Sequence, residues 1–163
     1  MDFTLLRLVL ADNSHVAELR RLVNTAYQGL AMMGLNFTGT YQDEALTQER
    51  MQGKEVHLAY LADELVGTVS LEDTVDDDGE RVLYLGQLAV LPAWQGHGLG
   101  RVLLRLAEKR AKEIGIRRIQ LDTAVPAIHL VRFYESENYI IVDTARWEGK
   151  TYQSYIMEKT LSV

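Results

Sequence analysis

The chain has 163 residues, of which 47% are hydrophobic and 25% charged, as expected for one globular domain with a sizeable core. The formal net charge is −6 without a block of Lys or Arg, and no apolar run approaches the roughly 18–20 residues that span a bilayer, so we expect neither nucleic-acid nor membrane binding. There is no cysteine, which excludes disulfides, thiolate catalysis and cysteine-based zinc sites. Residues 1–4 lack the pattern of a secretory signal, so we expect a cytoplasmic location.

The first third of the chain predicts one strand and two helices. Residues 3–10 are mostly apolar and predict a strand. Asp12, Asn13 and Ser14 can then cap a helix over 16–26, whose apolar residues recur at helical spacing. The glycine-rich segment 29–39 has no clean period, so it predicts a loop or broken helix that faces substrate. A short polar helix is expected over 40–50.

An antiparallel meander follows, with strands predicted over 57–61, 65–71 and 83–90. The Asp-Gly pair at 78–79 lies between β-rich runs and indicates a hairpin. The acidic residues 76–78 fit a solvated turn better than a metal site.

A glycine-rich loop joins the strand over 83–90 to an amphipathic helix over 99–114. Gly96, Gly98 and Gly100 leave little side-chain bulk around the first amide groups of that helix. Those amides have no partners within the helix, and the helix dipole places partial positive charge there. Such a loop is suited to an anion, most often a phosphate.

The remaining segments predict a strand over 117–123, a helix over 127–137, and two closing strands over 139–143 and 153–159. The expected fold is α+β, with a mixed, mostly antiparallel sheet of about six to seven strands and helices on both faces. We expect residues 1–163 to form one domain.

The loop fits neither a Walker A motif nor a dinucleotide fingerprint, because its spacing is Gly-x-Gly-x-Gly and it follows a hairpin. The segment 88–104 instead resembles the acyl-CoA-binding core of the GNAT acyltransferase superfamily. Gln95, Gly98 and Gly100 meet its [Gln/Arg]-x-x-Gly-x-[Gly/Ala] signature. The segment 132–139, with Phe-Tyr-Glu, resembles the late helix and strand of the family.

The resemblance implies transfer of an acetyl or other short acyl group from acetyl-CoA to an amine, which attacks the thioester directly. No protein nucleophile and no metal are needed, and the four histidines show no metal-ligand spacing. The residues implied in acetyl-CoA binding are Leu88, Ala89, Val90, Gln95, Gly96, His97, Gly98, Leu99, Gly100, Arg101 and Tyr134. Arg105 could assist Arg101 at the phosphates.

In this resemblance the backbone N–H of Val90 is the oxyanion donor and Tyr134 is the general acid that protonates the thiolate. Many relatives carry a glutamate near Gly86 or Gln87, and neither of these residues can act as a base. The substitutes that we expect are Glu72 or Asp73, at the end of the neighbouring strand, or a chain of waters to the surface.

The acceptor pocket is expected in the irregular early segment, at Tyr27, Met33, Asn36 and Phe37. A second departure from the family is Ala127, where many relatives carry an asparagine that orients the CoA arm. The two tryptophans fit packing or a subunit contact, and the resemblance makes a homodimer an expectation.

Two alternatives stay open. The absent strand glutamate leaves room for a catalytically silent acyl-CoA-binding or sensory module. The glycine loop by itself is also compatible with an anion- or nucleotide-binding protein of another fold.

Overall fold

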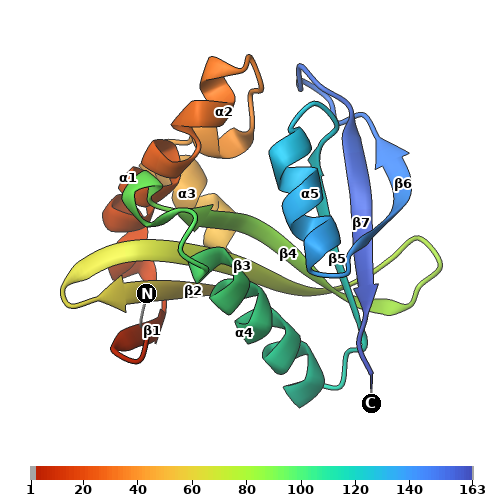
Figure 1. The fold of residues 1–163 in the computed structure, drawn as a ribbon, viewed down its shortest axis with the longest axis horizontal. Helices are drawn as coiled ribbons and strands as arrows, with labels where there is room; N and C mark the ends of the chain where they lie inside the picture. The colour runs from red at the N-terminus through yellow and green to blue at the C-terminus, as the bar shows by residue number, and fades with distance from the viewer. Residues whose placement is uncertain (1–2, 163) are drawn as a thin grey trace.

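A computed structural model of the chain describes residues 3–162 and shows a single sheet of seven strands in the order β1-β2-β3-β4-β5-β7-β6 (Figure 1). The strands are β1 (Leu6–Leu10), β2 (Glu55–Leu61), β3 (Glu64–Val75), β4 (Arg81–Val90), β5 (Arg118–Ala124), β6 (Ile140–Ala145) and β7 (Ser154–Thr160). All neighbouring strands are antiparallel except β4 and β5. The predicted α+β class with a mixed, mostly antiparallel sheet is therefore confirmed.

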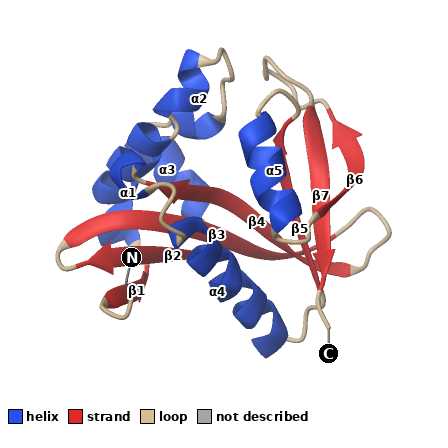
Figure 2. Ribbon diagram, in the orientation of Figure 1, coloured by secondary structure: helices blue, strands red, loops and turns tan. Residues whose placement is uncertain are grey.

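The sheet opens between its two parallel strands. β4 and β5 are paired only at Leu83–Ile119 and Tyr84–Gln120, and they diverge beyond this point, which gives the V shape seen in Figure 2. The register between β3 and β4 shifts at a bulge, where Gln87 has a φ of +48°. A bulge bends its strand and increases its twist, so it helps turn the end of β4 away from β5.

The helices divide between the two faces of the sheet. They are α1 (Val16–Ala26), α2 (Gln28–Met32), α3 (Glu44–Met51), α4 (Leu99–Glu113) and α5 (Ile128–Ser136). On one face α1 buries Leu19, Leu22 and Val23 against β2, β3 and the end of β4. On the other face α4 and α5 share the main core with β3, β4, β5 and β7. No helix within the described residues is long and apolar enough to cross a membrane.

Most predicted elements lie within a few residues of the observed ones. Two elements differ by four residues at one end. β3 extends to Val75 rather than ending at Leu71. α3 begins at Glu44 rather than at Thr40, because Asp43 caps it by accepting a hydrogen bond from the Leu46 amide at 2.8 Å. The segment 29–39 is a broken helix as expected, with α2 followed by a loop and a 3₁₀ turn at Thr38–Thr40.

The early loop is tied to the turn between β6 and β7, far along the chain. The Asn36 side chain donates to the Gly149 carbonyl at 2.8 Å and accepts from the Thr151 amide at 2.8 Å. Phe37 stacks on Tyr152 with the ring centroids 4.9 Å apart. These contacts join the first and last parts of the chain at the wide end of the V.

Candidate active site

The glycine loop forms a row of open amides at the start of α4. A 3₁₀ turn at Pro92–Trp94 leads into Gly96 and Gly98, whose φ values of +78° and +90° suit only glycine without strain. Within residues 3–162 no oxygen accepts a hydrogen bond from the N–H groups of residues 96–101. The loop therefore presents six consecutive unpartnered donors at a helix N-terminus, which is the arrangement that binds phosphate groups.

Gly100 is required for a different reason, since it allows α4 and α5 to approach each other. A Cβ built on Gly100 would lie 3.2 Å from the Cζ atom of Phe133. The loop is thereby held close to the helix that carries Tyr134.

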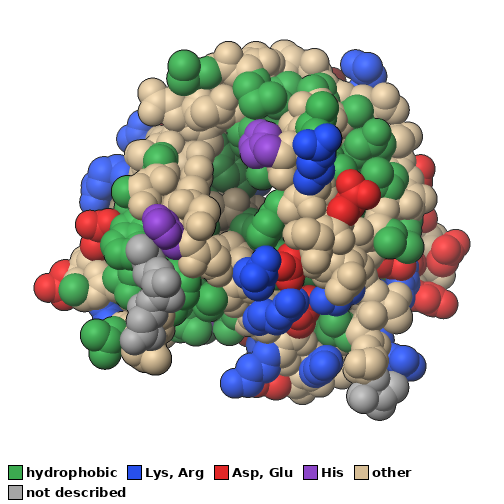
Figure 3. Space-filling model, in the orientation of Figure 1, with side chains coloured by type: hydrophobic (Ala, Val, Ile, Leu, Met, Phe, Trp, Pro, Cys, Tyr) green, Lys and Arg blue, Asp and Glu red, His purple; other side chains and the backbone are tan. Residues whose placement is uncertain are grey.

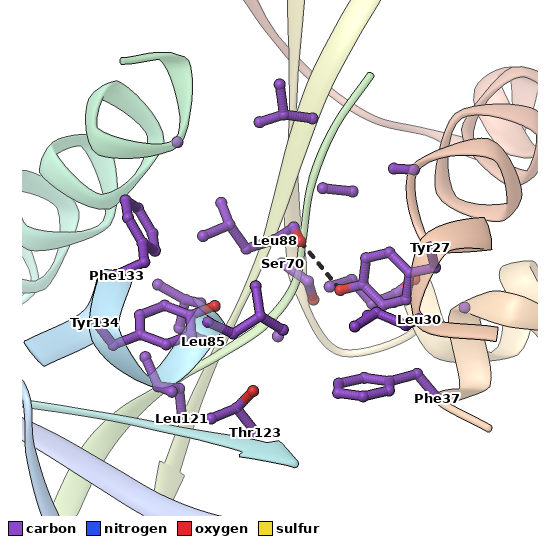
Figure 4. A pocket seen from close by; sticks show the side chains of 18 of the residues that line it. Tyr27, Leu30, Phe37, Ser70, Leu85, Leu88, Leu121, Thr123, Phe133 and Tyr134 are labelled. Carbon is purple, nitrogen blue, oxygen red and sulfur yellow. Dashed lines mark hydrogen bonds between the residues drawn. The ribbon is translucent and has the colours of Figure 1, made fainter. Parts of the chain in front are cut away.

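A cavity of about 1120 Å³ lies in the opening between the diverging ends of β4 and β5. Figure 3 shows the molecule hollowed there, with Lys and Arg side chains gathered on the surface over α4. Figure 4 shows that Phe133 and Tyr134 enter the cavity from α5, whereas Tyr27, Leu30 and Phe37 enter it from the opposite wall. The cavity thus has a wall made by α4 and α5 and a wall made by the early helices.

The end of β4 offers backbone groups to this cavity. The Leu91 amide donates to the Val66 carbonyl on β3 at 2.9 Å. Because N–H and C=O groups alternate sides along a strand, Ala89 also faces β3, whereas Leu88 and Val90 face the opening. Their carbonyls confirm this direction: that of Val90 accepts from the Gln95 side chain at 2.9 Å, and that of Leu88 accepts from the Tyr27 hydroxyl at 3.1 Å.

Tyr134 is buried, with 7% of its surface exposed, and its hydroxyl points into the cavity (Figure 4). No residue of the described chain, 3–162, hydrogen-bonds to this hydroxyl. Burial raises the pKa of Tyr134 well above its ordinary value of 10, and the charges of Tyr27, Tyr139 and Asp122 add to the rise. The phenol therefore stays protonated at neutral pH and is free to donate.

Two arginines of α4 bind the same buried carboxylate. Arg101 Nε lies 2.5 Å from Glu137 Oε1, and Arg105 Nη2 lies 2.8 Å from Glu137 Oε2. Only Arg101 lines the cavity, while Arg105 also pairs with Glu108 at 3.1 Å. The two arginines thus share a partner and differ in their access to the site.

A polar group that the sequence did not point to lies on β5, facing the early helices. Asp122 accepts hydrogen bonds from the Tyr84 hydroxyl at 2.6 Å and from the Trp147 indole N–H at 3.1 Å. Glu72, the predicted base, also lines the cavity and stands opposite Tyr84 in the register of β3 and β4. The alternation of β5 could have indicated that Asp122 faces away from the core, but nothing in the sequence pairs it with Tyr84 or Trp147.

The cavity brings most of the predicted site residues together. Those that line it are Tyr27, Met33, Phe37, Glu72, Leu88, Ala89, Val90, Gln95, Gly96, His97, Gly98, Gly100, Arg101 and Tyr134. Leu99 and Asn36 do not line it: the Leu99 side chain packs into the core, and Asn36 ties the early loop to the last turn. Ala127 is fully buried beside Leu30 and Leu35. Within residues 3–162 no group of three His, Cys, Asp or Glu side chains could hold a metal ion.

The sheet that opens between β4 and β5 and the row of open amides agree with the class that the sequence comparisons show, the acyl-CoA-dependent N-acyltransferases. The model of the acetyltransferase (GNAT) family matches residues 16–138, and the chain belongs to this family.

The relatives found by sequence and by structure agree with this assignment. An uncharacterized N-acetyltransferase from Escherichia coli K12, YjgM, is 26% identical over 85% of this chain and 83% of its own. A GNAT family acetyltransferase from Elizabethkingia anophelis, solved with acetyl-CoA bound, has a TM-score of 0.72 at 15% identity, covering 97% of this chain and 99% of its own. A GNAT acetyltransferase from Streptococcus pneumoniae has a TM-score of 0.70 at 20% identity, covering 96% and 99%.

Proposed function

We propose that this protein transfers an acetyl or other short acyl group from acetyl-CoA to an amine acceptor. The observation that carries the proposal is the row of unpartnered amides at residues 96–101, which opens into the same cavity as the free Tyr134 hydroxyl. The similar structure from Elizabethkingia anophelis, which holds acetyl-CoA, supports the choice of ligand.

The loop fits the diphosphate of CoA. No atom lies within 4 Å of a Cβ built on Gly96, so phosphate oxygens can approach the backbone there without a clash. The Arg101 guanidinium adds a positive charge at the edge of the cavity. The pantetheine arm then runs along the open side of β4, where Leu88 and Val90 present their backbone, and Ala89 contributes packing.

The chemistry divides among three groups of the chain. The Val90 N–H donates to the thioester oxygen as negative charge develops on it. The amine nitrogen forms the new bond to the acyl carbon while the C–S bond breaks, and Tyr134 gives its proton to the departing sulfur. The proton lost by the amine goes to Glu72 or through water to the surface, and Tyr134 is reprotonated from solvent.

A second candidate function is a module that binds acyl-CoA without transferring the acyl group. The specific observation in its favour is that Gly86 and Gln87, where many relatives carry a glutamate, offer no carboxylate. Glu72, on the neighbouring strand β3, is the carboxylate that could replace that glutamate as a base. The enzyme and the silent module differ in whether an amine stimulates release of the CoA thiol.

The experiment is a thiol-release assay with acetyl-CoA over a panel of amines, for the wild type and for Tyr134→Phe. Release stimulated by an amine supports the enzyme. We expect Tyr134→Phe to lower kcat by about 10²-fold and to change the KM for acetyl-CoA little, because the hydroxyl acts in the chemical step. Binding of acetyl-CoA without amine-stimulated release would favour the silent module, and an unchanged kcat in Tyr134→Phe would remove this residue from the mechanism.

A further inference from the structure

Arg50 and Lys150, like Lys54, line the cavity without a carboxylate partner among the described residues. Arg50, in the last turn of α3, is half-buried, and its Nη1 donates to the neutral Gln42 side chain at 2.7 Å. Lys150, in the turn between β6 and β7, donates to the Asn36 carbonyl at 3.0 Å and to the Thr38 hydroxyl at 2.8 Å, which are also neutral. Within residues 3–162 neither cation lies within 4 Å of an acidic group.

The partly buried cations of the described chain that lie outside the cavity, in contrast, all pair with a carboxylate, as Lys159 does with Glu108 at 2.5 Å. Arg118, which is also partly buried, pairs with Asp76 and with Glu158, each at 2.8 Å. Arg110 pairs with Glu55 at 2.9 Å. Burial lowers the pKa of Arg50 by more than the neighbouring groups, Asp122 among them, raise it, so the charge has lost water without full compensation. Arg50 would therefore gain from an anion brought by a ligand.

The same cavity contains two carboxylates without a cationic partner. Asp122 is held by the neutral Tyr84 and Trp147, and no residue of the described chain hydrogen-bonds to the Glu72 carboxylate. These anions and the two cations, Arg50 and Lys150, line one cavity but do not pair with one another. A cavity of this kind is complementary to a molecule that carries both charges.

We propose that the acceptor is an amine that also carries an oxyanion group such as a carboxylate, with the oxyanion bound by Arg50 and Lys150 and the ammonium group facing Asp122 and Glu72. This inference rests on the proposed function and adds its substrate class. A free amino acid carries both groups, one ammonium and one carboxylate. Arginine suits the anionic end because its planar guanidinium can donate two parallel hydrogen bonds to one carboxylate.

The test measures kcat/KM with acetyl-CoA for matched acceptors: an amino acid, its amide, the amine without its carboxylate, and the aminophosphonate of the same side chain. Each is assayed with the wild type, Arg50→Gln, Arg50→Lys and the control Arg21→Gln. Arg21 is exposed on α1 and does not line the cavity. Thermal unfolding reports whether each variant folds. The KM for acetyl-CoA reports whether each variant keeps its acetyl-CoA-binding site.

We expect the wild type to prefer an acceptor with the oxyanion by about 10- to 100-fold, the range of a charge-assisted contact. Arg50→Gln removes most of this preference, Arg50→Lys keeps part of it, and Arg21→Gln keeps all of it. The aminophosphonate arm shows whether the bound oxyanion is a planar carboxylate or a tetrahedral group.

The inference is overturned if the wild type uses amines without an oxyanion as well as those with one, or if Arg50→Gln keeps the full preference. Either result leaves acetyl transfer itself intact. The proposed function fails separately, if no acceptor stimulates thiol release while acetyl-CoA is present.

Discussion

The Tyr27 hydroxyl donates a hydrogen bond of 3.1 Å to the carbonyl of Leu88, across the cavity (Figure 4). Tyr27 ends α1, and Leu88 follows the bulge in β4, so this contact fixes the early helices to the strand that would hold the pantetheine arm. The Tyr27 ring is itself enclosed, because a Cβ on Gly39 would lie only 2.5 Å from its Cδ2 atom.

Loss of the hydrogen bond between Tyr27 and Leu88 should weaken binding of the acceptor more than binding of acetyl-CoA. We expect Tyr27→Phe to lower the free energy of unfolding by about 1 kcal/mol, the net value of one hydrogen bond. The same variant should raise the KM for the acceptor, because the early helices lose a hydrogen bond to β4. It should leave the KM for acetyl-CoA within about twofold, because β4 keeps its pairing with β3. Steady-state kinetics in both substrates measure this, and a rise confined to the acetyl-CoA KM would contradict it.

Gly98 is one of the two residues of the loop whose positive φ requires glycine. Alanine at this position costs about 1–2 kcal/mol of strain and forces the loop to rearrange its amides. We therefore expect Gly98→Ala to weaken acetyl-CoA binding by at least about tenfold, as measured by calorimetry.

Gly79 provides the matched control, because it has a φ of +81° in the hairpin between β3 and β4, away from the cavity. Gly79→Ala should lose similar stability in thermal unfolding and bind acetyl-CoA like the wild type. Equal affinities in the two variants would show that the loop conformation is not what binds the ligand.

Arg101 and Arg105 both pair with Glu137, so replacing each in turn distinguishes the effect of a positive charge on α4 from the effect of a side chain that lines the cavity. Arg101→Gln and Arg105→Gln each remove one positive charge and one contact with the same carboxylate. Since only Arg101 lines the cavity, we expect its replacement to raise the Kd for CoA about 3- to 10-fold at low salt, and less at high salt. Arg105→Gln should bind like the wild type; an equal loss in both variants would mean that the general positive potential of α4 is responsible.

The raised pKa of Tyr134 predicts a loss of stability in alkali. An unfolded tyrosine ionises near pH 10, whereas burial keeps the folded Tyr134 protonated to higher pH, so the unfolded state releases its proton first. The contribution of the raised Tyr134 pKa to the free energy of unfolding is complete below about pH 10. Above that pH it falls by about 1.4 kcal/mol per pH unit.

The difference in unfolding free energy between the wild type and Tyr134→Phe should consequently shrink by about 1.4 kcal/mol from pH 8 to pH 11, in denaturant titrations at each pH. Other buried tyrosines contribute equally to both proteins and cancel. A difference that stays constant over this range would show that Tyr134 ionises as easily in the fold as in the unfolded chain.

The sequence pattern was sufficient for the elements and for the loop. The strand-to-helix passage at residues 83–114 combines an apolar run, three glycines and an amphipathic helix, and each of these signals is local. The position of Tyr134 could be predicted because the Phe-Tyr-Glu motif at residues 133–135 resembles that of the GNAT family.

The acceptor half could not be predicted in the same way, because its contacts join distant parts of the chain. Asp122 meets Tyr84 and Trp147 only because β4 and β5 are parallel neighbours and the last turn folds back over them. Arg50 lies on a short helix whose exposed residues are Glu44, Ala45, Gln48 and Glu49, and nothing in the local sequence distinguishes a cation that lines a cavity from one that faces solvent. Asn36 has the residue type of a binding group, yet it serves the link to Gly149.

The most direct measurement is calorimetric titration of the purified protein with CoA and, separately, with pantetheine, which has the sulfur end but no diphosphate. The account predicts saturable heat for CoA and a far weaker signal for pantetheine, because the diphosphate is proposed to bind the open amides of residues 96–101. No heat with CoA at millimolar concentration, or equal affinity for pantetheine, would contradict it.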